Sequence, residues 1–266
     1  MKQSRFPFAL LLFGYAFLYA PIAVLVAYSF NESKLVTVWG GFSARWYGEL
    51  LHDGAFIDAA RLSFEVAAVS ATLSLLLGTL AAVALARGQG RWSLPLFGFL
   101  LGVPLVLPDV VIGLALLLAF VAAADVVGWP AERGAVTIVI AHATIATAYV
   151  AVVVRARLGE LDRSLEEAAQ DLGARPLSVF LRITLPLLFP ALLAGWLLAF
   201  TLSLDDVVVA QFVTGPGATT LPMEIFSSVR LGLSPKINAL GTLLVAAASA
   251  AVWIAWRLSL KPDRDS

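Results

Sequence analysis

Long apolar runs alternate with short polar segments along the whole chain, and this alternation is its dominant pattern. Six of the runs extend over about 20 residues or more, which is the length a helix needs to cross a hydrocarbon core. We expect membrane spans at residues 8–28, 59–86, 94–122, 135–154, 187–204 and 238–257. Because a helix pairs its backbone groups within itself, it is the element that such runs favour. The pattern predicts an all-α membrane protein, with all 266 residues in a single transmembrane domain.

Composition agrees with this class and excludes several others. The chain is 60% hydrophobic and 14% charged, whereas soluble domains are about 25% charged. It has no cysteine and a formal net charge of zero, which argue against a redox centre and against a nucleic-acid partner. The sequence also lacks the phosphate-binding pattern G-x-x-x-x-G-K-[ST]. We therefore expect membrane lipid around this chain, and no cofactor, metal or ATP bound by the chain itself.

The distribution of Lys and Arg residues predicts how the chain is oriented in the membrane. An even number of spans places both termini on one side. If that side is the inside, the inner segments hold two thirds of the 18 Lys and Arg residues, as expected for cytoplasmic segments. The apolar run 6–30 is too long for a signal peptide, so we interpret it as a retained first span. We therefore expect both termini and the polar segment 158–186 in the cytoplasm.

The segment 158–186 carries polar, helix-forming sequence between two apolar spans. Ser164 and Glu167 have the spacing of a capping box, so Ser164 is expected to cap a helix. Gly173 lies where a left-handed C-cap would end that helix, and Pro176 lies where a second helix would begin. We predict two short helices joined by a tight corner. This arrangement suits either a docking site for a partner or an amphipathic helix lying on the membrane.

The same segment contains the pattern E-A-A, three residues, G, nine residues, I-x-L-P. The matching positions are Glu167, Ala168, Ala169, Gly173, Ile183, Leu185 and Pro186. This pattern resembles the cytoplasmic loop of the membrane subunits of bacterial ABC importers, in which a coupling helix docks into a groove of a separate ATPase subunit. The resemblance implies the six-helix permease fold and ATP hydrolysis by that separate subunit. Pro186, with Pro190 after it, is also expected to mark a change in local structure.

Acidic residues within predicted spans are candidates for function, because charge is costly at membrane depth. Those that lie in the spans or at their ends are Glu65, Asp109, Asp205 and Asp206. Glu65 follows Arg61 by one helical turn, so we expect that pair to neutralise itself. His52, His142 and Arg133 are interpreted as structural. His142 has no second His or carboxylate at ligand spacing, so a metal site is not expected.

The three aspartates lead to a hypothesis about a substrate path. If the third span is helical from Leu94, Asp109 lies roughly 22 Å along it at about 1.5 Å per residue. It would then share the outer half of the membrane with Asp205 and Asp206, at the end of the fifth span. Two carboxylates at a helix C-terminus oppose the helix dipole, so something should compensate them. We expect Asp109 and Asp206 to line the path and Asp205 to cap a short helix over 206–212, although caps at Asp109 and Asp205 would also explain these residues.

A second resemblance covers the chain from the second span to its end. Its most specific parts are residues 201–209, 212–222 and 226–240, which read TLSLDDVVV, FVTGPGATTLP and FSSVRLGLSPKINAL. They are similar to permeases of the putrescine/spermidine importers, and the step Leu107-Pro108-Asp109 fits that branch as well. The resemblance implies a polyamine substrate, most closely putrescine. The partners it implies are a second homologous permease, two ATPase subunits and a periplasmic polyamine-binding protein.

Three alternatives to this expectation are an importer of another solute, a secondary transporter and a membrane enzyme. An importer of another solute, such as an amino acid or an oxyanion, shares the E-A-A pattern, but membrane-depth carboxylates argue against an anion. An ion-coupled secondary transporter usually shows internal repeats with broken helices, and no clear repeat relates the two halves of this sequence. A membrane enzyme would need a nucleophile–base pair or a metal cluster, which the sequence does not suggest.

Overall fold

The computed structural model describes residues 5–35, 38–88, 93–232 and 234–259. Within these ranges the regular elements are helices, and an isolated antiparallel bridge joins Asn31 to Phe42. Six helices are long and apolar enough to cross a membrane, which confirms the predicted number of spans. Residues 1–4, 89–92 and 260–266 carry part of the basic charge used to predict the orientation, and they lie outside the described ranges.

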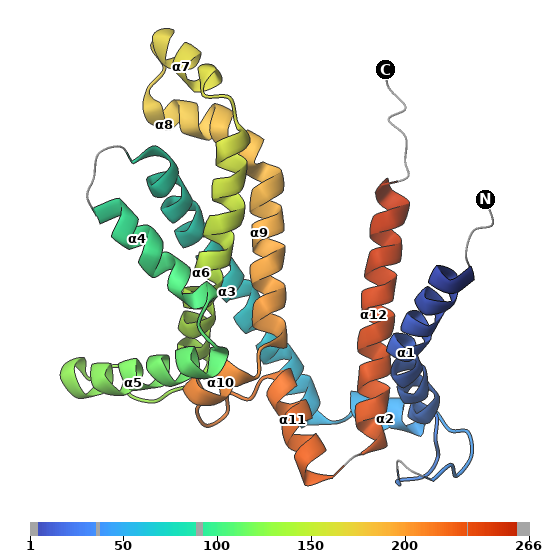
Figure 1. The fold of residues 1–266 in the computed structure, drawn as a ribbon. Helices are drawn as coiled ribbons and strands as arrows, with labels where there is room; N and C mark the ends of the chain where they lie inside the picture. The colour runs from blue at the N-terminus through green and yellow to red at the C-terminus, as the bar shows by residue number, and fades with distance from the viewer. Residues whose placement is uncertain (1–4, 36–37, 89–92, 233, 260–266) are drawn as a thin grey trace. The chain divides into compact units, whose positions relative to one another are not determined.

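Twelve α-helices follow one another along the described chain (Figure 1). They are α1 (Arg5–Ser29), α2 (Arg45–Leu51), α3 (Gly54–Arg87), α4 (Ser93–Gly102), α5 (Asp109–Val127), α6 (Ala135–Glu160), α7 (Ser164–Asp171), α8 (Pro176–Val179), α9 (Leu185–Asp205), α10 (Val208–Val213), α11 (Leu221–Leu231) and α12 (Pro235–Ser259). A 3-10 turn (Val103–Leu105) follows α4, and a π-helical turn (Phe180–Thr184) joins α8 to α9.

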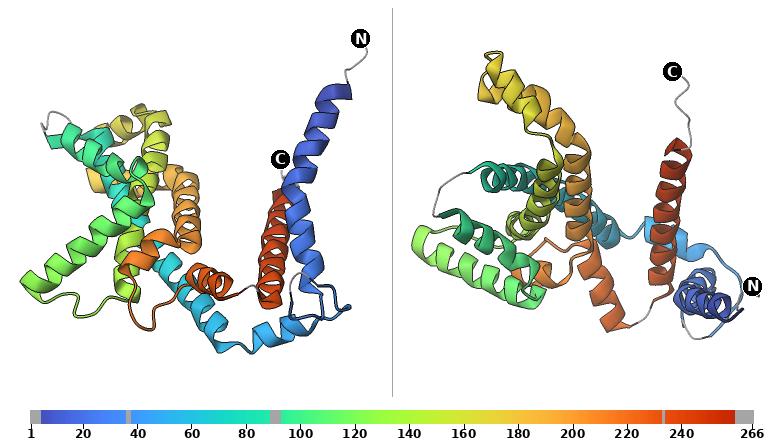
Figure 2. Two further views of the ribbon diagram at one scale, coloured as in Figure 1. Left: turned by 60° about the horizontal axis from the view of Figure 1, so that its bottom comes forward. Right: turned by 45° about the horizontal axis from the view of Figure 1, so that its top comes forward.

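The helices form two compact units, of which the first comprises residues 1–57 and 225–266. In this unit α1 lies beside α12 (Figure 2), and Gly241 allows the side chain of Leu25 to approach the α12 backbone. The connection between α1 and α3 contains α2, which packs on α12. Lys236, in the first turn of α12, donates to Asp53 at 3.0 Å.

The second unit comprises residues 58–224 and holds both sites described below. Its centre is α6, which packs most extensively against α9. Small residues on α3 face α6: Ser70 donates to the carbonyl of Val139 and Ser74 to that of Ala143, each at 3.2 Å. One turn further, Gly78 lies so close to Val150 that an added Cβ would stand 2.8 Å from its side chain. Small residues that let helix backbones approach are the usual means of packing in membranes.

The third predicted span is broken rather than continuous. α4 ends at Gly102, the 3-10 turn contains Pro104, and α5 begins at Asp109 directly after the extended Pro108. Proline removes a backbone donor and clashes with the preceding turn, so two prolines four residues apart end one helix and allow another to start. α4 and α5 run in different directions (Figure 1). The prediction of one continuous helix, on which the 22 Å for Asp109 rests, is therefore wrong.

The fifth predicted span is longer than expected. Helix continues from Pro176 through the π turn to Asp205, a candidate span of 30 residues. Pro186 follows directly after the π turn, in the first turn of α9, and Pro190 is accommodated inside the helix. The expected change of structure thus lies at the π turn just before Pro186.

Candidate functional site

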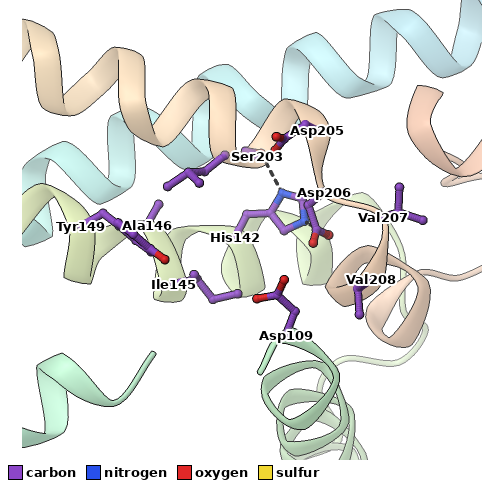
Figure 3. A pocket seen from close by; sticks show the side chains of 11 residues that line it. Asp109, His142, Ile145, Ala146, Tyr149, Ser203, Asp205, Asp206, Val207 and Val208 are labelled. Carbon is purple, nitrogen blue, oxygen red and sulfur yellow. Dashed lines mark hydrogen bonds and ion pairs between the residues drawn. The ribbon is translucent and has the colours of Figure 1, made fainter. Parts of the chain in front are cut away.

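A cavity of about 400 Å³ opens in the second unit where the start of α5, the middle of α6 and the end of α9 meet (Figure 3). It is lined by Asp109, His142, Ile145, Ala146, Tyr149, Leu202, Ser203, Asp205, Asp206, Val207 and Val208. The three aspartates singled out in the sequence thus line one pocket, although Asp109 is almost a hundred residues from the other two. A concave pocket with a few convergent polar groups is the usual form of a small-solute site.

The Asp206 carboxylate is held by a histidine and by the backbone of the next helix. His142 Nε2 lies 3.1 Å from Asp206 Oδ2, and His142 Nδ1 lies 2.7 Å from the Ser203 hydroxyl. Because an ionised carboxylate only accepts, Nε2 is the donor in the bond to Asp206. His142 is buried, with 3% of its side chain exposed. His142 therefore supplies the compensation expected at this helix end to Asp206.

Asp206 also caps α10. Its Oδ1 and Oδ2 accept from the backbone amides of Val209 and Ala210 at 3.2 and 2.7 Å. This reverses the prediction that Asp205 is the cap. The cap position depends on where α9 ends, and the backbone turns to an extended conformation at Asp206, one residue later than the prediction required.

Asp109 and Asp205 are the two carboxylates of the pocket without a compensating partner. Both are exposed to the cavity, and neither makes a hydrogen bond or ion pair with another residue in the described part of the chain. Asp109 is the first residue of α5, where the helix dipole favours negative charge, and its carboxylate points into the pocket (Figure 3). The pocket therefore carries two carboxylates that are free to meet a cation.

Glu65, another acidic residue considered in the sequence, lies outside the pocket. Glu65 accepts from Arg61 at 2.8 Å on the exposed surface of α3, which confirms the predicted pair. His142, interpreted as structural, is the residue that the sequence analysis missed. It lies 64 positions before Asp206, so no local spacing could connect the two.

The segment 158–186 contains the predicted pair of short helices, α7 and α8, with a tight corner at Gly173. Gly173 has φ +86°, the left-handed conformation that glycine adopts without strain. The amide of Gly173 donates to Gln170 and that of Ala174 to Ala169, which is a Schellman C-cap. Pro176 begins α8 as predicted.

The N-terminus of α7 differs from the predicted capping box. Ser164 is already inside α7, and its amide donates to Asp162 Oδ1 at 2.9 Å. The same hydrogen bond lowers the pKa of the Asp162 carboxyl below its ordinary value. A Ser at capping-box spacing was ambiguous because Asp162, two residues earlier, is an equally good acceptor.

The motif residues of this segment divide into an exposed and a half-buried set. Glu167, Ala168, Gly173 and Pro186 are exposed, whereas Ala169, Ile183 and Leu185 are partly buried. Leu172 is 90% exposed, and Leu165 and Leu177 are also well exposed. An apolar surface of this kind on a polar loop is typical of a contact with another protein or with the membrane.

The fold and these two sites together define a membrane-spanning transport subunit, with a polar pocket between its helices and an exposed helical loop outside the pocket. The chain belongs to the family of binding-protein-dependent transport system inner membrane components, whose model matches residues 74–258. It is thus a multi-pass protein of the inner membrane. Its family implies a substrate-binding protein and an ATPase as partners.

Individual relatives agree with this assignment. The chain is 59% identical over 263 residues to the putrescine transport system permease protein PotI of Escherichia coli (strain K12), covering 98% of this chain and 93% of the relative. It is 41% identical over 232 residues to the spermidine/putrescine transport system permease protein PotC of the same strain, covering 87% and 85%. The resemblance seen in the sequence is therefore confirmed.

Solved structures show the same fold. A chain of a bacterial ABC transporter involved in the import of the acidic polysaccharide alginate matches with a TM-score of 0.69 and 17% identity, covering 99% of both chains. A chain of the MetNI methionine ABC transporter matches with a TM-score of 0.62 and 15% identity, covering 75% of this chain and 92% of that one. At these identities the likeness concerns the fold alone.

Proposed function

We propose that this chain is the permease subunit of an ATP-driven importer that carries polyamines across the bacterial inner membrane, with putrescine as the main substrate and spermidine as the alternative. Its partners are a second homologous permease, two ATPase subunits and a periplasmic polyamine-binding protein. Both termini face the cytoplasm, the chain holds no cofactor, and ATP is hydrolysed on the ATPase subunits. The names of its relatives, which are putrescine and spermidine/putrescine permeases, support the substrate class.

The observation that carries the proposal is the pair of uncompensated carboxylates, Asp109 and Asp205, in one pocket. A polyamine carries two or more ammonium groups on a flexible chain. A carboxylate in a medium of low effective dielectric attracts such a cation, and the cation offsets the cost of removing the carboxylate from water. Because Asp206 is occupied by His142 and by two amides, Asp109 and Asp205 remain for the substrate.

Besides the substrate pocket, the proposal assigns a role to the exposed helices α7 and α8, which is contact with an ATPase subunit. Leu172 at the corner and Leu165 and Leu177 beside it offer an apolar surface for a groove. Glu167 and Gly173 belong to the motif of this loop, and the Gly173 turn fixes the direction in which α8 leaves α7. This supports the coupling role that the sequence pattern implies for Glu167, Ala168, Ala169, Gly173, Ile183, Leu185 and Pro186.

An importer of another solute is the remaining alternative. An oxyanion or the carboxylate of an amino acid would be repelled by Asp109 and Asp205, and the described lining of the pocket has no Lys or Arg to counter them. The pocket therefore favours a cation with no acidic group of its own.

Uptake of radiolabelled putrescine by the assembled transporter in proteoliposomes tests the proposal. We expect Asp109→Asn and Asp205→Asn each to lower uptake by about tenfold or more, the equivalent of about 1.4 kcal/mol of lost attraction. Asp125→Asn, on the same helix as Asp109 but outside the pocket, is the matched control and should transport normally. Normal uptake by both pocket variants, or competition by amino acids but not by spermidine, would refute the proposal.

A further inference from the structure

One carboxylate joins the exposed helical loop to two membrane helices. Glu166, in α7, forms an ion pair with Arg87 at the end of α3, and the same oxygen accepts from the Thr184 hydroxyl at 2.5 Å. Arg87 and Thr184 are 79 and 18 residues away from Glu166 in sequence. The Glu166 side chain is only 15% exposed and Thr184 is fully buried, so this cluster lies inside the junction of loop and helices.

A second contact fastens the start of the loop to the same place. Arg163 Nη2 donates to the carbonyl of Ala86 at 3.1 Å, one residue before Arg87. Glu167, the next residue after Glu166, is exposed, and its carboxylate makes no hydrogen bond or ion pair in the part of the chain that the structure describes. Adjacent residues on a helix point about 100° apart. The two neighbouring glutamates therefore point in different directions, Glu166 toward the membrane helices and Glu167 toward the exposed surface of the loop.

The position of Thr184 ties this contact to the pocket. Thr184 is the last residue of the π turn, and α9 runs from there to Asp205 in the pocket. Single π turns inside helices occur frequently at functional sites. Removing one member of a partly buried ion pair leaves the other charge unsatisfied, so the cluster holds its three elements together only while all members are present.

We propose that Glu166 is a positioning residue that fastens the loop to α3 and α9, so that movement of the loop is passed to these helices instead of being absorbed by bending of the loop. This inference rests on the coupling role proposed above for α7 and α8. It assigns transmission to Glu166 and docking to the exposed face of the loop.

The assembled transporter in proteoliposomes provides the test, with three readouts: recovery of the ATPase in pull-downs, ATP hydrolysis, and putrescine taken up per ATP hydrolysed. We expect Glu166→Gln to retain ATPase recovery but to lower uptake per ATP by about tenfold, within the usual range of coupling between sites. Thr184→Val removes only the hydroxyl donor and should lower the same ratio by less. It also keeps the proposal testable if Glu166→Gln fails to insert.

Two controls separate transmission from docking and from general damage. Glu160→Gln removes a comparable charge from an exposed ion pair with Arg157 at the end of α6, and should leave all three readouts unchanged. If Arg87 and Glu166 act as one link, the double variant Arg87→Gln/Glu166→Gln should lose no more uptake per ATP than the worse single variant.

Unchanged uptake per ATP in both Glu166→Gln and Thr184→Val, or additive losses in the double variant, would overturn the inference. Loss of ATPase recovery in Glu166→Gln would make Glu166 a docking residue and would equally overturn it. Failure of the coupling role itself would appear differently, as ATPase recovery that is insensitive to Leu172→Glu on the exposed face.

Discussion

The residue whose role changes most between sequence and structure is His142. It joins Ser203 and Asp206 across two helices and thereby satisfies the carboxylate that caps α10. We expect His142→Phe to keep an aromatic ring but to remove the hydrogen bonds to Ser203 and Asp206, at a cost of about 1–3 kcal/mol in the free energy of unfolding. Denaturant unfolding of the purified protein in detergent measures this loss.

His52→Phe is the matched control for that experiment. His52 is exposed, and its ring contacts only the carbonyl of Gly48 within its own helix turn. Its replacement should change stability little, because the histidine can exchange that bond for water. Equal stability of the two variants would show that the bond between His142 and Asp206 contributes nothing to the fold.

At the residue scale, the sequence identifies the carboxylates that are costly to place in a membrane, but it does not identify the residues that bind them. Asp109, Asp205 and Asp206 could be predicted as pocket residues because charge at membrane depth needs a reason. Which of two adjacent aspartates caps a helix depends on a single residue of helix length, and helix ends are uncertain by one or two residues. The role of His142 could not be predicted from the sequence, because its partners Ser203 and Asp206 lie more than 60 residues away from it in the chain.

At the scale of elements, the ion pair between Asp53 and Lys236 links the start of α3 to the start of α12 within the first unit. The hydrogen bond from Lys236 holds the pKa of Asp53 below its ordinary value of 3.8. Glu49 Oε2 also approaches Lys236, at 4.0 Å. Because the folded pKa of Asp53 is lowered, the pair stabilises the protein above the unfolded pKa, and this stabilisation is lost as the pH falls through the folded pKa.

The corresponding prediction is that Asp53→Asn lowers stability at neutral pH by about 0.5 kcal/mol, since the pair is partly exposed and screened by water. The difference between variant and wild type should shrink below pH 3.8 and vanish below the folded pKa. Thermal unfolding in detergent over this pH range measures it, with Asp125→Asn as a variant that removes an unpaired carboxylate. A difference that persists unchanged in acid would contradict the assignment.

Among the elements, five of the six spans were predicted well. The predicted spans lie within α1, α3, α6, α9 and α12, because apolar runs of this length leave little choice of structure. The third span failed because Pro104 and Pro108 can either kink a helix or end it, and only the packing of α5 on α10 decides between these outcomes. Pro190 shows the reverse case, a proline that α9 accommodates.

At the scale of the whole molecule, the proposed orientation can be tested because the chain has no cysteine. Leu172→Cys, at a position that is 90% exposed on the loop, should react with an impermeant thiol reagent only from the cytoplasmic side. Thr219→Cys, exposed in the connection after α10, should react only from outside. Ala218 beside it is buried and would not report. Reversed labelling would contradict the orientation with both termini inside.

The bend between α8 and α9 has a mechanical consequence for the pocket. These helices and the π turn between them form one continuous segment, with α8 directed across the axis of α9 (Figure 1). Because α8 is joined to α9 at an angle, a swing of α8 around the axis of α9 turns α9 about that axis. Asp205 is the last residue of α9, at the end away from α8. A swing of α8 would therefore re-aim the Asp205 carboxylate by a comparable angle, presenting it to a cation or withdrawing it without any helix sliding across the membrane.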